Sequence, residues 1–219
     1  MPMDLLPHTK PLSGFLGPGG VLERVRIDKH VARSVYGVRL TRVIEELSQE
    51  WPRLAGAVLE VTASGSLKPP AYAVSRISTF RTVSGHLGVS KHALRSDLSD
   101  AELLGLNIVN RSVGSTFEEV LVHEWGHLLM NVDLARRYLH DFEQGVEDFV
   151  CFLERESGVP RDEAAVALSG MASIDSRELV AEAFTAARAG STDPFPATVM
   201  EAFQNMWTPP PSYLPGWAI

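Results

Sequence analysis

The chain has 219 residues, a formal net charge of −7 and a single cysteine. Its 45% of hydrophobic residues is enough to bury a substantial core in one domain. The negative charge and the absence of a Lys/Arg cluster argue against binding to the phosphate backbone of a nucleic acid. Because Cys151 has no second cysteine to pair with, the fold does not need an oxidising compartment, and we predict a buried, inert thiol.

The two ends of the chain differ in composition from the region between them. Residues 1–20 are rich in Pro and Gly and are interpreted as an extended arm without the features of a signal peptide. Residues 208–219 form a Pro-rich tail, and 21–207 are assigned to one domain. No apolar run approaches the roughly 18 residues that a membrane span needs. We expect a cytoplasmic protein by default, or one that is virion-associated or exported by a specialised system.

The first half of the domain combines a helical pattern with several short strand patterns. Apolar residues at steps of three and four predict a long amphipathic helix over about 28–51. Strands are predicted at 57–62, 71–77, 85–90 and 105–110, where short apolar runs are bounded by Gly, Pro or Asn. The last of these directly precedes the most informative part of the sequence.

The central motif is His123-Glu124-Trp125-Gly126-His127. Residues four apart lie on one face of a helix, so the two histidines can bind one cation while Glu124 stands beside it. This is the HExxH arrangement of zinc hydrolases. A catalytic zinc takes a third protein ligand and a water, and Glu124 is placed to accept the proton of that water. The alternative interpretation is a core helix with two hydrogen-bonded histidines.

The residues around the motif predict that it lies within a helix. Residues 115–118 fit a capping box that would start the helix, and 116–119 offer a second register. Asn131 is the predicted end. Inside a helix Gly126 costs about 1 kcal/mol relative to alanine, so we expect a neighbouring backbone or side chain to pass close to it.

Four further helices are predicted after the motif from apolar spacing and from Gly and Pro at their ends. They are a helix that contains 139–153 and ends by Gly158, a short one from Pro160 to about 169, one over 176–188 closed by Gly190, and one over 197–207.

The third zinc ligand is expected among the carboxylates of these helices. Glu178 and Glu182 share one helix face, which is unfavourable for like charges unless a cation or hydrogen-bond donors offset it. Spacing alone allows either to be the ligand, and Glu143 and Glu147 are the next candidates. Alternatively, Glu178 completes a capping box with Asp175 and Glu182 is solvated.

Three segments carry a resemblance to a known family. The sequences HEWGH at 123–127, ELVAEAF at 178–184 and GSTD at 190–193 resemble the catalytic domain of anthrax lethal factor and related metallopeptidase domains of bacterial toxins and phage-encoded proteins. The resemblance covers about 105–193. It implies an α+β, zincin-like fold, in which a small mixed sheet, a long helix and the HExxH helix are followed by a helical lower half across a cleft.

The resemblance also implies a role for each matching residue. The Zn²⁺ ion would be bound by His123, His127 and Glu178. Glu124 would be the general base, and Glu182 would orient one of the ligands without binding the metal. Lethal factor has a catalytic tyrosine shortly before its glutamate ligand, whereas this chain has none in 170–176.

The donor for the oxyanion is therefore unassigned. Tyr138, His140 and Tyr213 are the distant candidates.

We therefore predict a zinc metallopeptidase that cleaves a protein or peptide substrate, which could lie as an added strand on a sheet edge at 85–90. Two alternatives remain. One is a structural or assembly protein, such as a phage component, that keeps a zinc-binding zincin fold with little or no proteolysis. The other is a zinc-free helical binding module.

Overall fold

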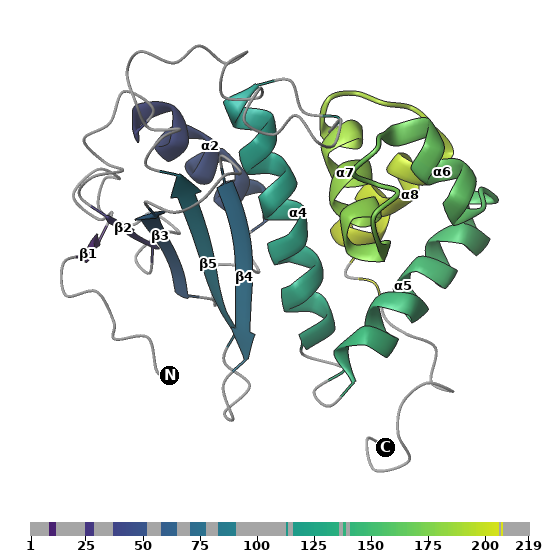
Figure 1. Cartoon of the computed structure of the whole chain (residues 1–219), viewed down its shortest axis with the longest axis horizontal. Helices are drawn as coiled ribbons and strands as arrows, with labels where there is room; N and C mark the ends of the chain where they lie inside the picture. Colours follow the sequence, from purple (N-terminus) through teal and green to yellow (C-terminus); the bar gives the residue numbers. More distant parts are fainter. Residues whose placement is uncertain are drawn as a thin grey trace.

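The computed structural model of the chain describes residues 9–11, 25–28, 37–51, 58–64, 71–77, 83–90, 113, 116–135, 138, 141–205 and 207. In the strands the description covers the backbone only. Figure 1 shows strands on one side, a group of helices on the other, and helix α4 (Phe117–Ala135) running between them.

The described strands form one five-stranded sheet in the order β1-β2-β3-β5-β4. Their bounds are Thr9–Pro11 (β1), Val25–Asp28 (β2), Val58–Ser64 (β3), Ala71–Ile77 (β4) and Val83–Ser90 (β5). The outer pairs β1/β2 and β4/β5 are antiparallel, and β2/β3 and β3/β5 are parallel. Strands occur where 57–62, 71–77 and 85–90 predicted them, whereas 105–110 lies outside the described residues.

Strand β5 is an interior strand, which corrects one prediction. Its residues Ser84–Ser90 pair with β3 along one side, and Val83–Val89 pair with β4 along the other. Because both sides of its backbone are already paired, 85–90 is not an edge to which a substrate strand can add.

The other described helices are α2 (Gly37–Glu50), α5 (Phe142–Ser157), α6 (Arg161–Leu168), α7 (Ser176–Arg188) and α8 (Pro194–Gln204). Helix α7 has the predicted bounds, and α5 ends at Gly158, whose φ of 70° suits glycine. The long helix predicted over 28–51 was extended too far, because Asp28 belongs to β2. Asn131 does not end α4, which continues to Ala135.

The predicted α+β class needs correction. Of the residues whose side chains the structure describes, 78% are helical and none lies in a strand. The buried apolar side chains of the described core come from helices and the segments that join them. Because consecutive segments after residue 116 carry apolar stripes at helical spacing, they bury one another as packed helices, and the described core is not a zincin-like core built on a mixed sheet.

An aromatic cluster joins four of these helices at their ends or centres. Trp51, which follows α2, packs edge-on against Phe184 of α7 at 5.8 Å between ring centroids. Phe184 contacts Phe203 of α8 at 5.6 Å. Phe149 of α5 contacts Phe203 at 5.7 Å and Trp207 at 5.0 Å. Such offset and edge-to-face pairs add to the free energy of apolar burial, so this cluster holds α7 in a defined position.

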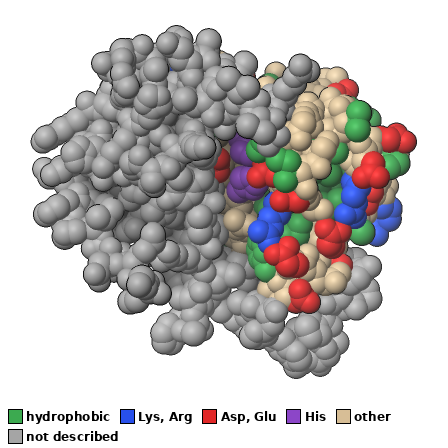
Figure 2. Space-filling model, viewed as in Figure 1, with side chains coloured by type: hydrophobic (Ala, Val, Ile, Leu, Met, Phe, Trp, Pro, Cys, Tyr) green, Lys and Arg blue, Asp and Glu red, His purple; other side chains and the backbone are tan. Residues whose placement is uncertain are grey.

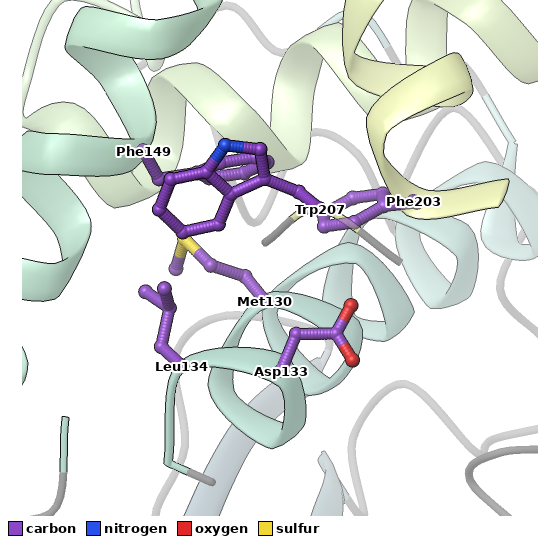
Figure 3. A pocket seen from close by; sticks show the side chains of 6 residues that line it. All are labelled: Met130, Asp133, Leu134, Phe149, Phe203 and Trp207. Carbon is purple, nitrogen blue, oxygen red and sulfur yellow. The ribbon is translucent and has the colours of Figure 1, made fainter. Parts of the chain in front are cut away.

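Next to this cluster is a small recess beside the C-terminal half of α4 (Figure 3). Its lining residues are Met130, Asp133, Leu134, Phe149, Phe203 and Trp207.

Among the described helices, none is long and apolar enough to cross a membrane.

Cys151 is exposed on α5, so the prediction of a buried thiol is wrong. The buried stripe of this helix runs through Val146, Phe149, Val150 and Leu153. Cys151 directly follows Val150 in sequence, and one residue corresponds to a rotation of about 100° around the helix axis.

The start of α4 is held by a reciprocal capping box in the second of the two predicted registers. Thr116 Oγ1 accepts a hydrogen bond from the Glu119 backbone N–H at 3.2 Å, and Glu119 Oε2 accepts one from the Thr116 N–H at 2.9 Å. Glu118 does not take part in this capping box and instead forms a bidentate ion pair with Arg39 of α2. This pair joins α2 to the first turn of the motif helix.

We predict that Arg39→Ala lowers the free energy of unfolding by about 1 kcal/mol at pH 7, near the upper limit for a partly exposed pair. The hydrogen bonds from Arg39 hold the pKa of Glu118 below its usual range in the folded chain. The stabilisation is therefore present above the unfolded pKa and is lost as the pH falls through the folded pKa. Denaturant unfolding between pH 7 and pH 3 measures it.

Arg42→Ala is the matched control, because Arg42 is exposed, pairs within its own helix with Glu46, and acts on Glu118 only through its charge, the smallest of the causes that shift the pKa of Glu118. It should cost less than about 0.5 kcal/mol. An Arg39→Ala loss that does not change with pH would contradict the ion-pair explanation.

Candidate metal centre

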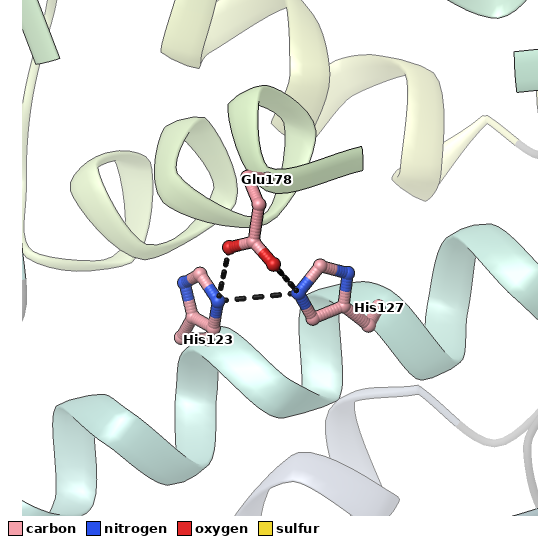
Figure 4. A group of neighbouring side chains, drawn as sticks. All are labelled: His123, His127 and Glu178. Atoms are coloured by element: carbon pink, nitrogen blue, oxygen red, sulfur yellow. Dashed lines mark hydrogen bonds and ion pairs between the residues drawn. The ribbon is translucent and has the colours of Figure 1, made fainter. Parts of the chain in front are cut away.

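The two histidines of the motif lie one turn apart on α4 and point their rings at the same place (Figure 4). Their Nε2 atoms are 3.2 Å apart. Glu178 reaches the same place from α7, with Oε2 at 3.1 Å from His123 Nε2 and Oε1 at 3.4 Å from His127 Nε2. The structure thus brings together the three residues predicted as ligands, from segments more than fifty residues apart in sequence.

The spacing of these atoms would let one metal ion bind all three residues. With metal–ligand bonds of 2.0–2.1 Å, two ligands of a tetrahedron lie about 3.3–3.4 Å apart. The two Nε2 atoms, 3.2 Å apart, are close to that value, and Glu178 contacts His123 with Oε2 at 3.1 Å and His127 with its other oxygen, Oε1, at 3.4 Å. In addition, Glu178 Oε2 is buried against His123. Two imidazole nitrogens and one carboxylate are the donor set that catalytic zinc takes in hydrolases.

Gly126 allows α7 to come close enough to α4 for this contact. A Cβ at this position would lie 3.1 Å from Phe184 Cδ1 and 3.2 Å from the Cα of Ala181. The prediction of a close neighbour at Gly126 is therefore confirmed, and the neighbour is the ligand-bearing helix itself. The approach places Glu178 and Glu182 opposite the motif histidines.

Glu182 is fully buried behind His123. Its Oε1 lies 2.9 Å from His123 Nδ1, and its Oε2 accepts a hydrogen bond from the backbone N–H of Val113 at 2.6 Å. A carboxylate on Nδ1 orients the ring so that Nε2 faces the ligand cluster. The alternative of a solvated Glu182 is wrong. Sequence reasoning missed Val113, because a backbone donor has no side-chain signature.

The protonation behaviour of the site reflects its excess of carboxylates. Burial opposes protonation of His123, but the contacts with Glu178 and Glu182 and the charge of Glu124 outweigh it and raise the pKa of His123 to about 10. Burial also acts to raise the pKa of Glu178, yet the two histidines hold it well below its usual range. A metal ligand must be deprotonated, so a metal ion bound here would compete with protons for His123.

The backbone around Glu178 is organised by the cap of α7. Asp175 Oδ1 accepts hydrogen bonds from the N–H groups of Arg177 at 2.8 Å and Glu178 at 2.9 Å. This is half of the capping box that was considered as an alternative, but the Glu178 carboxylate faces the histidines. Its place in the first turn also puts the negative charge near the positive end of the helix dipole.

The other ligand candidates have different partners. Glu143 pairs with Arg177, and Glu147 pairs with Arg161.

The hydroxyl of Tyr138 donates to Asp148 Oδ2 at 2.9 Å, and the Tyr138 ring packs on Gly145 of α5. The structure therefore does not direct Tyr138 towards the zinc ligands. His140 and Tyr213 lie outside the described residues.

The ligand cluster is accessible from one face of the molecule. Histidine atoms are visible beside acidic atoms at the edge of the coloured helical surface in Figure 2. The side chains of His127 and Glu178 are 14% and 22% exposed, so a small ion can reach them.

Comparisons of the chain with protein-family models, with curated proteins and with solved structures give no match. The resemblance to lethal-factor-like domains therefore depends on the motif residues alone.

Glu178 and Glu182 should differ in their effect on zinc binding. We expect Glu178→Ala to abolish stoichiometric zinc in a chelator-buffered titration at pH 7.5, because it removes a donor. Glu182→Ala should weaken binding by about 10–100-fold and leave a site, because it removes only the support of His123. If Glu182→Ala lost zinc completely and Glu178→Ala kept it, the two roles would be reversed.

Gly126→Ala tests the close approach of the helices. Helix propensity alone would make alanine more stable by about 1 kcal/mol. The contacts at 3.1 and 3.2 Å predict the opposite, a net loss of about 1–2 kcal/mol with weaker zinc binding, because the added methyl group pushes α7 away. Denaturant unfolding and zinc titration of the same variant measure both effects. A stabilised variant with unchanged zinc affinity would disprove the packing argument.

Proposed function

We propose that the protein is a zinc-dependent metallopeptidase that hydrolyses peptide bonds. The observation that carries the proposal is the convergence of His123, His127 and Glu178 at contact distances of 3.1–3.4 Å, with Glu124 next to His123 in the same helix. The motif resemblance to lethal-factor-like peptidases supports a protein or peptide as the substrate.

Each residue of the site has a proposed task. The two Nε2 atoms and the Glu178 carboxylate would hold the zinc ion, and Glu182 would keep His123 in its orientation. A bound zinc ion would act as a Lewis acid and would lower the pKa of a bound water to about 7. Glu124 would take a proton at the site and return it to the leaving amine; its burial and the action of its charge on His123 support this role.

A second candidate function is a zinc-binding structural or assembly protein with little proteolysis. The observation that favours it concerns the hydrogen-bond donor that a peptidase needs to stabilise the oxyanion of its reaction. The hydroxyl of Tyr138 is engaged by Asp148 at 2.9 Å, so this tyrosine does not supply the donor that the peptidase family places near its zinc. Turnover distinguishes the two functions, since both bind zinc.

The proposal is tested by zinc content and by hydrolysis with Glu124→Gln. The purified chain should carry about one zinc, and His123→Ala or His127→Ala should remove most of it. Glu124→Gln should retain zinc but lower hydrolysis of a broad peptide library by at least about a hundredfold, the typical contribution of a general base. Mass-spectrometric counting of cleaved peptides and metal analysis give both quantities.

Glu163→Gln is the control, because Glu163 is an exposed carboxylate in the first turn of α6. It should hydrolyse at the parent rate. Equal turnover by Glu124→Gln and the parent would disprove the general-base role. Zinc binding without turnover by the parent would favour the structural function.

A further inference from the structure

The ligand Glu178 lies in the first turn of its helix, where a helix frays most easily. A metal ligand in such a turn needs support from outside the helix. The three consecutive side chains of this turn have separate partners. Ser176 and Arg177 contact α5, and Glu178 faces the histidines of α4.

Ser176 contacts Glu147 of α5, and both oxygens of the Glu147 carboxylate accept a hydrogen bond. Ser176 Oγ donates to Glu147 Oε1 at 2.8 Å. The other oxygen, Oε2, accepts from Arg161 Nη1 at 2.6 Å. Because both oxygens have partners, the carboxylate has little rotational freedom left and presents Oε1 to Ser176 in one geometry.

Arg161 is itself held firmly at the start of α6. Its Nε and Nη2 donate to Glu154 Oε2 at 3.2 and 3.1 Å, and its backbone N–H donates to Glu154 Oε1 at 2.8 Å. Its Nη1 also lies 3.5 Å from Ser176 Oγ. Arg161 therefore connects two carboxylates of α5 with the first residue of α7.

Arg177 makes the remaining contact between this turn and α5. It pairs with Glu143 and stacks over the Phe142 ring at 5.1 Å. The Glu143 side chain is 77% exposed, against 49% for Glu147, so solvent screens the Arg177 pair more strongly. Glu147 is thus the better placed of the two to restrain the turn.

We propose that Glu147 is a positioning residue for the metal ligand Glu178 and acts through Ser176, with Arg161 holding its carboxylate in place. The proposal depends on the metal site described above. Glu147 orients the first turn of α7, and that turn delivers the Glu178 carboxylate to the two histidines. The hydrogen bonds of Arg161 and Ser176 keep the pKa of Glu147 below its usual range, so it is ionised at neutral pH.

The test compares zinc affinity among single variants. Glu147→Ala and Ser176→Ala should each raise the zinc dissociation constant about tenfold, the lower end for residues that support a ligand. Glu147→Gln should recover part of the loss, because its amide oxygen can still accept from Ser176. Glu156→Ala is the matched control, since Glu156 is 48% exposed on the same helix and pairs with Arg155. Its dissociation constant should equal that of the parent.

The same substitutions in a Glu178→Ala background separate positioning from general destabilisation. If Glu147 acts through Glu178, Glu147→Ala has no further effect on the remaining zinc affinity, measured with a weaker chelator. The visible absorption of the cobalt-substituted single variant should also shift, because one donor has moved. An equal loss in both backgrounds, or an unchanged affinity in the single variants, would overturn the proposal.

The outcome also distinguishes this proposal from the proposed function. A parent chain that binds zinc while Glu147→Ala binds it equally well would overturn the positioning role alone. A parent chain that binds no zinc would overturn both. Should Glu147→Ala fail to fold, Ser176→Ala keeps the test valid, because it removes one hydroxyl and leaves the Asp175 cap of α7 in place.

Discussion

The candidate site depends on one close contact, the approach of α7 to α4 at Gly126. With no side chain at that position, Ala181 and Phe184 of α7 lie directly against α4. The aromatic cluster behind Phe184 holds α7 in this position, since it packs on α2, α5 and α8. At this separation Glu178 contacts both histidines. The packing of α7 in the core therefore also determines the geometry of the site.

The close approach concentrates negative charge. Glu124, Glu178 and Glu182 lie around two histidines in a largely buried place. Such an arrangement is costly unless positive charge offsets it, because burial removes the screening of water. A proton on His123 offsets part of it, as the pKa of about 10 indicates. A divalent cation would offset more, and His123, His127 and Glu178 form a group that could hold one.

The features that sequence predicted well are those with a local cause. The bounds of α7 follow from the Asp175 cap and from Gly190 at a φ of 95°. The pair of histidines follows from helical geometry alone. The fold class and the position of β5 were wrong, because they depend on which distant surfaces pair. The predicted helix included Asp28, because an amphipathic pattern does not reveal that Asp28 pairs with Thr9 of another strand. Ion pairs such as Arg161 with Glu147 join separate helices and leave no spacing signal.

The exposure of Cys151 gives the chain a built-in attachment point. It is the only cysteine, its side chain is exposed, and its sulfur lies 3.4 Å from Arg161 Nη2. A thiol-directed fluorophore would therefore label one position without any engineered residue, beside the guanidinium that links α5, α6 and α7. Its emission would report on the surroundings of that junction in solution.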